Sequence, residues 1–328
     1  MKNQLLILAI LLLASFANVS TSFAQCGDAQ HPMAGKSYPY SLTVDPIGGQ
    51  FFWFVTSDPH ISTPAPILSG AAGGDILIGG TGYNLPGTLL STIDITWTSQ
   101  AVANANATPT PTKYYLVVQY TTACTNNVKP WRITPMNLFQ IAVENVNAAG
   151  STYADICRVP YVDVLIGADD KVTYNFGENA LYLKVTANNF TGSWTPTVNI
   201  AALSASLTSP QTIKSIEWSL TTTFTGVSNF NLTSGVATAT VPDKLGDNIT
   251  TGTDEFVYIK VIITDDKFEG LAEQSFAFNL SATDMAGNPD VDVDAACATV
   301  AENDNVIQKL KARPAMTNPN PTPFLTIN

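Results

Sequence analysis

Charged side chains are scarce in this sequence, and histidine is scarcer still. Asp, Glu, Lys and Arg make up 12% of the 328 residues, and the two histidines are His31 and His60. A Ser-His-Asp or Cys-His nucleophile system needs a histidine held beside the nucleophile. Because each histidine stands next to a proline with no catalytic motif around it, the sequence argues against nucleophilic catalysis and predicts a protein that is not an enzyme.

Long hydrophobic runs are absent beyond the first residues. The run LLILAILLLASF, residues 5–16, follows Lys2 and precedes the small residues Ser22 and Ala24. A positive start, a short apolar run and a small-residue cleavage site form the pattern of a secretory signal peptide, whereas a membrane helix needs about 20 apolar residues. Residues 1–24 are therefore predicted to be a signal peptide. The mature chain is predicted to be secreted, extracellular or at the cell surface, without a transmembrane segment.

Basic clusters are also missing, apart from the short stretch at residues 309–313, and the formal net charge is −11. Nucleic acids and anionic membrane surfaces attract proteins through patches of Lys and Arg. The sequence therefore argues against both as partners. Its acidic balance favours solubility outside the cell or the recruitment of cations.

Cysteine is limited to four residues, and none has the spacing of a zinc site or of a CxxC redox pair. An even number of cysteines in a secreted protein indicates disulfides, and four cysteines allow three pairings. Pairing of Cys26 with Cys124 and of Cys157 with Cys297 would place one bridge around each half of the chain. The sequence favours this arrangement and leaves the other two open.

Strand patterns are what the sequence does contain, most clearly in residues 256–288. Two segments there alternate apolar and polar side chains on either side of an acidic, glycine-containing turn. Successive side chains of a strand point to opposite faces, so a hairpin of two such strands needs a second sheet to cover its apolar face. We therefore expect a hairpin within a β-sandwich. The apolar faces consist of Val257, Ile259, Val261 and Ile263 in the first segment and Phe276, Phe278 and Leu280 in the second.

Similar alternation recurs along the chain between turns rich in Gly and Pro. Short strands at this spacing argue for β-sandwiches with few helices. Residues 104–112 are predicted to be a loop, and residues 145–153 a linker between two domains. The strands expected in the first half cover residues 38–44, 50–56, 93–98 and 114–120, with a short one at residues 76–78 and a last one centred on residues 138–143.

The predicted fold class is all-β, with two Ig-like β-sandwich domains in tandem and an extended C-terminal tail. The N-terminal domain is expected over residues 25–150 and the C-terminal domain over residues 151–306, with its final strand near residues 296–300. The tail, residues 307–328, is rich in proline and is therefore expected to be extended.

Three segments of the first half, SYPYSLTVDPIGGQFFWFVTSD, IDITWTS and YYLVVQYTTACTNN, carry a progression of aromatic-rich strands over about residues 37–145. This progression resembles the PKD-like and immunoglobulin-like modules of secreted Bacteroidetes surface proteins. In the second half, EQSFAFNLSATDMAGNPD and ATVAENDN are similar to the end of bacterial Ig-like and cadherin-like repeats. The resemblance implies an extracellular structural or adhesive module and not a catalyst.

Acidic and amide side chains gather near the end of the second half. Calcium takes several oxygen ligands, which acidic turns at the ends of sandwich strands can supply. The run DVDVD, residues 290–294, starts like an EF-hand loop but has Ala295 where that loop requires glycine. The resemblance to cadherin-like repeats implies ligand roles for Asp284 and for residues 303–305. Calcium is thus the one possible cofactor, and its candidate ligands are Asp284, Asn288, Asp290, Asp292, Asn303, Asp304 and Asn305.

Five tryptophans offer surfaces on which a sugar ring could stack. Trp53, Trp97 and Trp218 lie inside predicted strands, where a tryptophan buried between two sheets is common. These three are expected in the core. Trp131 and Trp194 lie nearer to loops and are the candidates for stacking against a glycan.

Two functions of different classes fit these patterns, and a third stays open. The first is a non-catalytic, secreted cell-surface protein with a structural or adhesive role, which binds other cell-surface proteins or copies of itself and can assemble into a surface polymer. The alternative is a carbohydrate-binding protein that uses exposed aromatic side chains. A hydrolase would need two carboxylates from loops such as those at Asp169 and Asp265, a pattern more typical of solvated turns.

Overall fold

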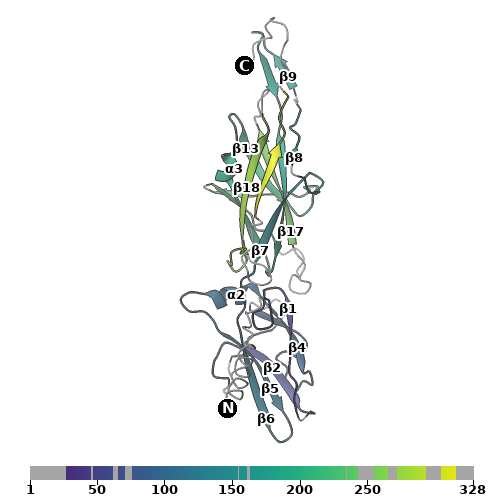
Figure 1. The fold of residues 1–328 in the computed structure, drawn as a ribbon, viewed down its shortest axis with the longest axis vertical. Helices are drawn as coiled ribbons and strands as arrows, with labels where there is room; N and C mark the ends of the chain where they lie inside the picture. The colour runs from purple at the N-terminus through teal and green to yellow at the C-terminus, as the bar shows by residue number, and fades with distance from the viewer. Residues whose placement is uncertain are drawn as a thin grey trace, which may run out of the picture.

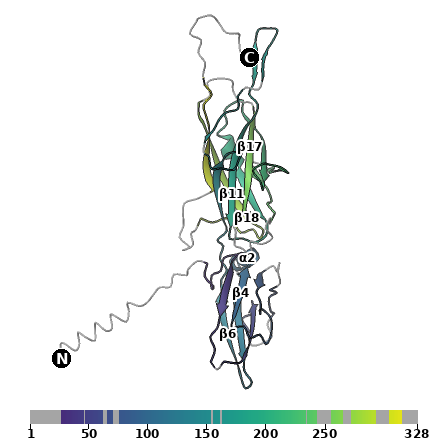
Figure 2. The same ribbon diagram turned by 90° about the vertical axis from the view of Figure 1, so that its right-hand side faces the viewer.

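The computed structural model describes residues 27–45, 47–61, 66–70, 76–153, 155–160, 163–233, 235–242, 255–264, 272–292 and 304–314. Their strands form two β-sandwiches that follow one another along a single long axis (Figure 1, Figure 2). The all-β fold class predicted from the alternating side chains is confirmed. No helix in the described part of the chain is long and apolar enough to cross a membrane. The expected signal peptide, residues 1–24, and the tail beyond residue 314 lie outside the described residues.

The N-terminal sandwich consists of two three-stranded antiparallel sheets. Its core is aromatic, because Trp53 and Trp97 are fully buried between the sheets together with Leu116. Each indole N–H has an acceptor, the Leu90 carbonyl at 2.9 Å for Trp53 and the Tyr40 hydroxyl at 3.2 Å for Trp97. The sheet orders are β1 (Ser37–Ser41), β4 (Thr92–Trp97), β3 (Leu77–Gly79) and β2 (Gln50–Thr56), β5 (Tyr114–Thr121), β6 (Asn126–Ile133).

The C-terminal sandwich is larger and pairs a five-stranded sheet with a six-stranded one. All its strand pairs are antiparallel except β19 with β8, which is parallel. The five-stranded order is β14 (Ser228–Asn229), β13 (Thr212–Ser219), β17 (Glu255–Thr264), β11 (Asn179–Asn188), β7 (Gln140–Val146). The six-stranded order is β15 (Asn231–Thr233), β16 (Val236–Thr238), β12 (Trp194–Asn199), β18 (Gln274–Asp284), β19 (Asn305–Leu310), β8 (Asp155–Ile156).

Strands β17 and β18 confirm the predicted alternation but not the predicted hairpin. Every residue assigned to their apolar faces is buried in one core cluster. However, β17 pairs with β11 and β13, whereas β18 pairs with β12 and β19 in the opposite sheet. The hairpin was wrong because two apolar faces of this size can also cover each other across a sandwich, which leaves the hydrogen-bonding edges for other strands.

Two expected boundaries also differ from the structure. The strand β7, expected to close the N-terminal domain, pairs with β11 and buries Ile141 and Val143 in the C-terminal core. The tail was expected to begin at residue 307. Strand β19 instead extends to Leu310, which is fully buried. The second sandwich therefore begins near residue 139 and includes residues up to 310.

Three smaller elements complete the fold. Helix α2 (Ser99–Asn106) lies between the two sandwiches (Figure 1, Figure 2) and takes up the start of the expected loop at residues 104–112. Helix α3 (Ile200–Ser204) follows β12. Strands β9 (Asp163–Ile166) and β10 (Val172–Asn175) form a two-stranded hairpin, here called the ribbon, which projects from the far end of the C-terminal sandwich.

One buried amide joins the two sheets of the C-terminal sandwich. Gln308 of β19 is fully buried, and its Oε1 accepts from the Tyr182 N–H at 3.1 Å. Its Nε2 donates to the carbonyls of Tyr182 and Val146 at 3.1 and 3.3 Å. The side chain thus continues the β11 edge at the point where β7 ends, since Tyr182 and Val146 form the last pair of that ladder.

Replacing Gln308 by leucine should destabilise the protein, because it leaves one buried N–H and two buried carbonyls without partners. We expect Gln308→Leu to lower the free energy of unfolding by about 1–3 kcal/mol, measured by denaturant titration. The neighbouring Ile307 is exposed, so Ile307→Ala should change the unfolding free energy by less than about 0.5 kcal/mol. Equal stability of the two variants would contradict a structural role for the amide.

Candidate binding site

The N-terminal sandwich is open along one side. Strand β1 is the edge of one sheet and β6 the edge of the other, and neither has a second partner among the described strands. The two edges face each other across two cavities, both lined by residues of each edge or its continuation. We call this side the seam and define it by residues 39–45 and 126–133.

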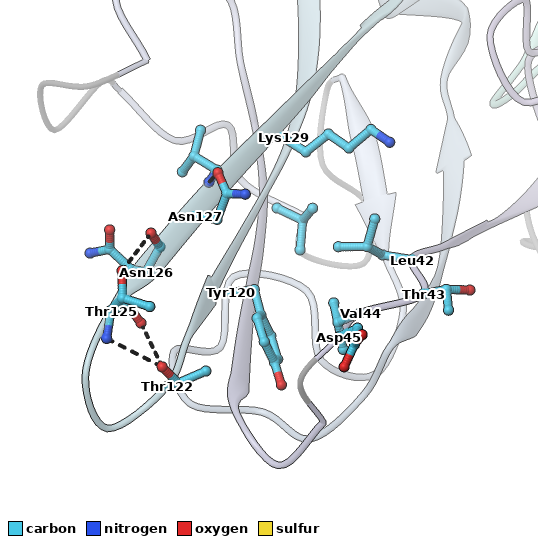
Figure 3. Close-up of a pocket in the computed structure, with 12 residues that line it drawn as sticks. Leu42, Thr43, Val44, Asp45, Tyr120, Thr122, Thr125, Asn126, Asn127 and Lys129 are labelled. Atoms are coloured by element: carbon cyan, nitrogen blue, oxygen red, sulfur yellow. Dashed lines mark hydrogen bonds between the residues drawn. The ribbon is translucent and has the colours of Figure 1, made fainter.

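The larger cavity of the seam has a volume of about 440 Å³. Figure 3 shows Asn126, Asn127 and Lys129 of β6 opposite Leu42 and the residues that follow it, with Tyr120 between the two walls. The wall is mixed, because aliphatic side chains alternate with hydroxyl and amide groups. The lining residues are Leu42, Thr43, Val44, Asp45, Val118, Tyr120, Thr122, Thr125, Asn126, Asn127, Val128 and Lys129.

Local geometry holds the walls of this cavity. At the turn between β5 and β6, the Thr122 N–H donates to the Thr125 carbonyl at 2.8 Å and the Thr125 N–H to Thr122 Oγ1 at 3.2 Å. The Gly49 N–H donates to the Tyr120 hydroxyl at 2.7 Å. A β-carbon at position 49 would lie 2.5 Å from Tyr120 Cζ, so this close approach requires glycine.

The smaller cavity, of about 180 Å³, continues the seam toward the end of β6 that contains Trp131 and Ile133. It is lined by Pro39 and Tyr40 of β1 and by Trp131 and Ile133 of β6, among others. The Tyr40 hydroxyl donates to the Ala29 carbonyl at 2.6 Å. Burial raises the pKa of Tyr40, so the hydroxyl stays protonated and keeps this donor role at neutral pH.

The edges of the seam carry residues that oppose the addition of another strand. Pro130 lies within β6 and Pro39 within β1, and proline offers no N–H to a neighbouring strand. Lys129 adds a charge on the exposed edge of β6, a common protection against edge-to-edge pairing. The seam is therefore suited to recognise side chains that enter its cavities and unsuited to extend either sheet.

The two tryptophans proposed to stack against a glycan have different surroundings. Trp194 is fully buried in the C-terminal core, next to Phe190, so the prediction of an exposed stacking surface is wrong for this residue. Trp131 is partly exposed and lies in the seam. The Trp131 ring stacks on the Trp53 ring, with 6.1 Å between ring centroids and 10° between planes. Lys129 Nζ lies 5.5 Å from the centroid of the Trp131 ring.

The predicted disulfides stay predictions. Cys124 and Cys157 are both exposed, and neither forms a disulfide within the described residues. Their expected partners, Cys26 and Cys297, lie outside the described residues. Cys124 belongs to the turn between β5 and β6, at one end of the larger cavity.

Asp284, at the end of β18, is one of the expected calcium ligands and is committed to hydrogen bonds. Its carboxylate accepts from the N–H groups of Ala286 and Asn288 at 3.0 and 2.9 Å and from Asn288 Nδ2 at 2.8 Å. Asp290, another expected ligand, accepts from the Ala282 N–H at 2.7 Å. Asp284, Asn288 and Asp290 are thus brought together, but their contacts shape the turn that follows β18.

The remaining expected calcium ligands lie elsewhere. Asn305 starts β19 and pairs with Asn279, which lies roughly 17 Å along an extended strand from Asp284. The Asp304 carbonyl accepts from Leu280 of the same ladder, Asp292 ends a described segment, and Asn303 lies outside the described residues. In the part of the chain that the structure describes, no three His, Cys, Asp or Glu side chains form a group that could hold a metal ion. Calcium binding by these residues stays a prediction.

The turn after β18 and the loop after β11 instead contact the N-terminal sandwich. The Ser99 N–H donates to Thr191 Oγ1 and the Thr191 N–H donates to Ser99 Oγ, both at 2.9 Å. Asn288 Nδ2 donates to the Ser99 carbonyl at 3.0 Å. All three side chains are buried, and we call them the junction. Because Ser99 begins α2 and the other two residues belong to the C-terminal sandwich, the junction fixes the two sandwiches to each other.

Sequence patterns missed most of the seam. The β6 sequence NNVKPWRI has little alternation of apolar and polar residues, and it is largely exposed. A signal was nevertheless present, because a lysine and a proline between apolar residues are typical of an edge strand. The junction left no such signal, because Ser99, Thr191 and Asn288 come from three distant segments.

No family model and no curated protein matches this chain, so the resemblance to PKD-like modules stays a prediction. The solved structures that are similar to it include BcpA, the major pilin subunit of Bacillus cereus, with a TM-score of 0.27 and 8% identity over 84% of this chain and 85% of that chain. Another is the N-terminal domain of the Streptococcus gordonii adhesin Sgo0707, with a TM-score of 0.25 and 9% identity over 82% and 54%. The collagen-binding domain of the Erysipelothrix rhusiopathiae surface protein RspB gives 0.20 and 6% over 87% and 86%.

The junction predicts a measurable effect of Thr191→Val. This variant keeps the shape of the side chain but leaves the buried Ser99 N–H without its acceptor, so the free energy of unfolding should fall by about 1–3 kcal/mol. Small-angle X-ray scattering should also show a wider range of interdomain orientations. The exposed Thr233 provides the control, and Thr233→Val should leave stability and scattering unchanged. Identical scattering and stability for both variants would contradict the role of the junction.

Proposed function

We propose that this chain is a non-catalytic, secreted protein of the cell surface with a structural or adhesive role. The observation that carries this proposal is the buried junction, which holds two sandwiches end to end by reciprocal backbone and side-chain hydrogen bonds. Domains joined by a single linker move relative to each other unless contacts fix them. A fixed pair of sandwiches keeps its two ends a constant distance apart, as a spacer or a subunit of a larger assembly requires.

The predicted signal peptide and the acidic composition support the extracellular location. They are independent of the junction, since they come from the first residues and from the overall charge. The seam supports a binding role, because it offers a concave surface lined by both apolar and polar side chains, a combination that ligand sites commonly have.

The location can be tested on intact cells that produce the protein. Antibody labelling and brief protease treatment of unbroken cells should detect and remove the protein, because a surface protein is accessible to both. A cytosolic protein of known abundance serves as the control for cell integrity. Recovery of this protein only from the cytosolic fraction, without labelling of intact cells, would overturn the proposed function.

A second candidate function, carbohydrate binding, is favoured by one observation. Trp131 is partly exposed and lines the smaller cavity of the seam beside Pro39 and Tyr40. Aromatic rings at the mouth of a cavity provide the flat surface on which sugars stack.

Glycan-array binding followed by titration calorimetry tests this candidate. If a glycan binds, Trp131→Ala should weaken its binding roughly two- to tenfold, the range expected for loss of a ring-stacking contact. The matched control is Tyr153→Ala, which removes an exposed ring from the segment between β7 and β8, outside the seam. Absence of glycan binding by the unmodified protein, or equal affinities for both variants, would exclude Trp131 as a sugar platform.

A further inference from the structure

The ribbon exposes an apolar strand to solvent. Val164, Leu165 and Ile166 are consecutive residues of β9, and they are 38%, 66% and 57% exposed. A two-stranded hairpin alone is marginally stable in water, and three exposed aliphatic residues in a row are costly to solvate. The described ribbon has no other strand on either edge, so its apolar strand is suited to a partner surface.

The base of the ribbon is nevertheless held in place. Tyr174 of β10 stacks on Phe176, with 5.6 Å between ring centroids and 12° between planes. The guanidinium carbon of Arg313 lies 3.9 Å from the Phe176 ring centroid, which ties the base to the chain that follows β19. The exposed strand therefore projects from a supported base at one end of the molecule (Figure 1).

The opposite end of the molecule carries the larger cavity of the seam. Figure 1 places β6 at the end farthest from β9, and the turn between β5 and β6 forms part of the cavity wall. Two exposed aliphatic residues adjoin this region. Val128, 42% exposed, lines the cavity, and Ile47, 86% exposed, lies two residues before the Gly49 that bonds to Tyr120.

The distribution of charge distinguishes between the ways in which two copies could meet. Residues 27–136 contain five acidic and four basic side chains, whereas residues 137–314 contain 21 acidic and ten basic ones. Contact between two ribbons would bring two strongly acidic halves together. Contact between a ribbon and a seam brings an acidic half to a nearly neutral one, which avoids most of this repulsion.

Local charges favour the same arrangement. The ribbon carries Asp163 and Asp170, while Asp169 is already paired with Lys171 at 3.3 Å. Lys129 lines the cavity and forms no ion pair within the described residues, with its ammonium 5.5 Å from the Trp131 ring. Asp45 lines the same cavity, so its two charged lining residues are of opposite sign. An acidic ribbon that enters next to Lys129 would give this ammonium a carboxylate partner.

We propose that the ribbon of one copy docks in the larger cavity of the seam of the next copy, so that the chains associate head to tail. The inference rests on the proposed structural role and names the two surfaces that would carry it. Leu165 would contact the apolar part of the cavity wall, which includes Val128, while Val164 and Ile166 lie on the opposite face of β9. Because the two surfaces lie at opposite ends of the molecule and differ from each other, the contact is heterologous and repeats into an open filament.

Two single substitutions and their mixture test this arrangement. Leu165→Asp places a charge on the ribbon and leaves the cavity intact, whereas Val128→Asp does the reverse. Sedimentation velocity and light scattering should show that the unmodified protein forms larger species as its concentration rises. Each variant alone should need at least about tenfold higher concentration to associate. An equimolar mixture should form dimers and stop there, because each dimer retains one impaired ribbon and one impaired cavity.

Ile307→Asp is the matched control, because Ile307 is 57% exposed on β19, between the two ends of the molecule. It should associate like the unmodified protein, and circular dichroism should show the same strand content for all four proteins. Assembly unaffected by either variant, or dimers that persist in Val128→Asp alone, would overturn the ribbon–seam contact while self-association stands. A monomer at every concentration would overturn self-association itself, whereas the surface location would still be decided by labelling of intact cells.

Discussion

The shared core of β17 and β18 is the constraint on which the rest of the C-terminal sandwich depends. Each strand buries one complete face in the same core cluster, and the two strands belong to opposite sheets. A strand whose face is buried in this way cannot shift by one residue without moving every apolar side chain to the other face. The register of β11 and β13 against β17, and of β12 and β19 against β18, is therefore fixed by the same core.

That fixed register also determines where the N-terminal sandwich can attach. The turn after β18 is held by the carboxylate of Asp284, which presents Asn288 to the Ser99 carbonyl. Thr191 approaches Ser99 from the loop between β11 and β12. Two loops of the C-terminal sandwich thus hold the start of α2. The ends of the molecule acquire a definite separation because the contact in the middle is buried and has directional hydrogen bonds.

The alternation of side chains predicted the fold class and the buried faces correctly, because a strand has a period of two whatever its partners are. It could not predict pairing, and the expected hairpin of β17 with β18 failed for that reason. Trp194 was misplaced because a tryptophan near a loop can still face a core. The seam was largely invisible because β6 is exposed and thus free of the apolar constraint that makes a strand recognisable. Ser99, Thr191 and Asn288 meet only through the tertiary fold.

The protection of the sheet edges and the exposure of the ribbon have one physical consequence in common. Pro39, Lys129 and Pro130 prevent the seam from growing by backbone pairing, so uncontrolled edge-to-edge aggregation is opposed at the open side of the sandwich. Side-chain contacts are not opposed there, since the cavity offers both aliphatic and polar side chains to an entering group. An association that depends on side chains entering a cavity is selective for a partner of matching shape and charge. The same surface can therefore remain open and still be specific in what it binds.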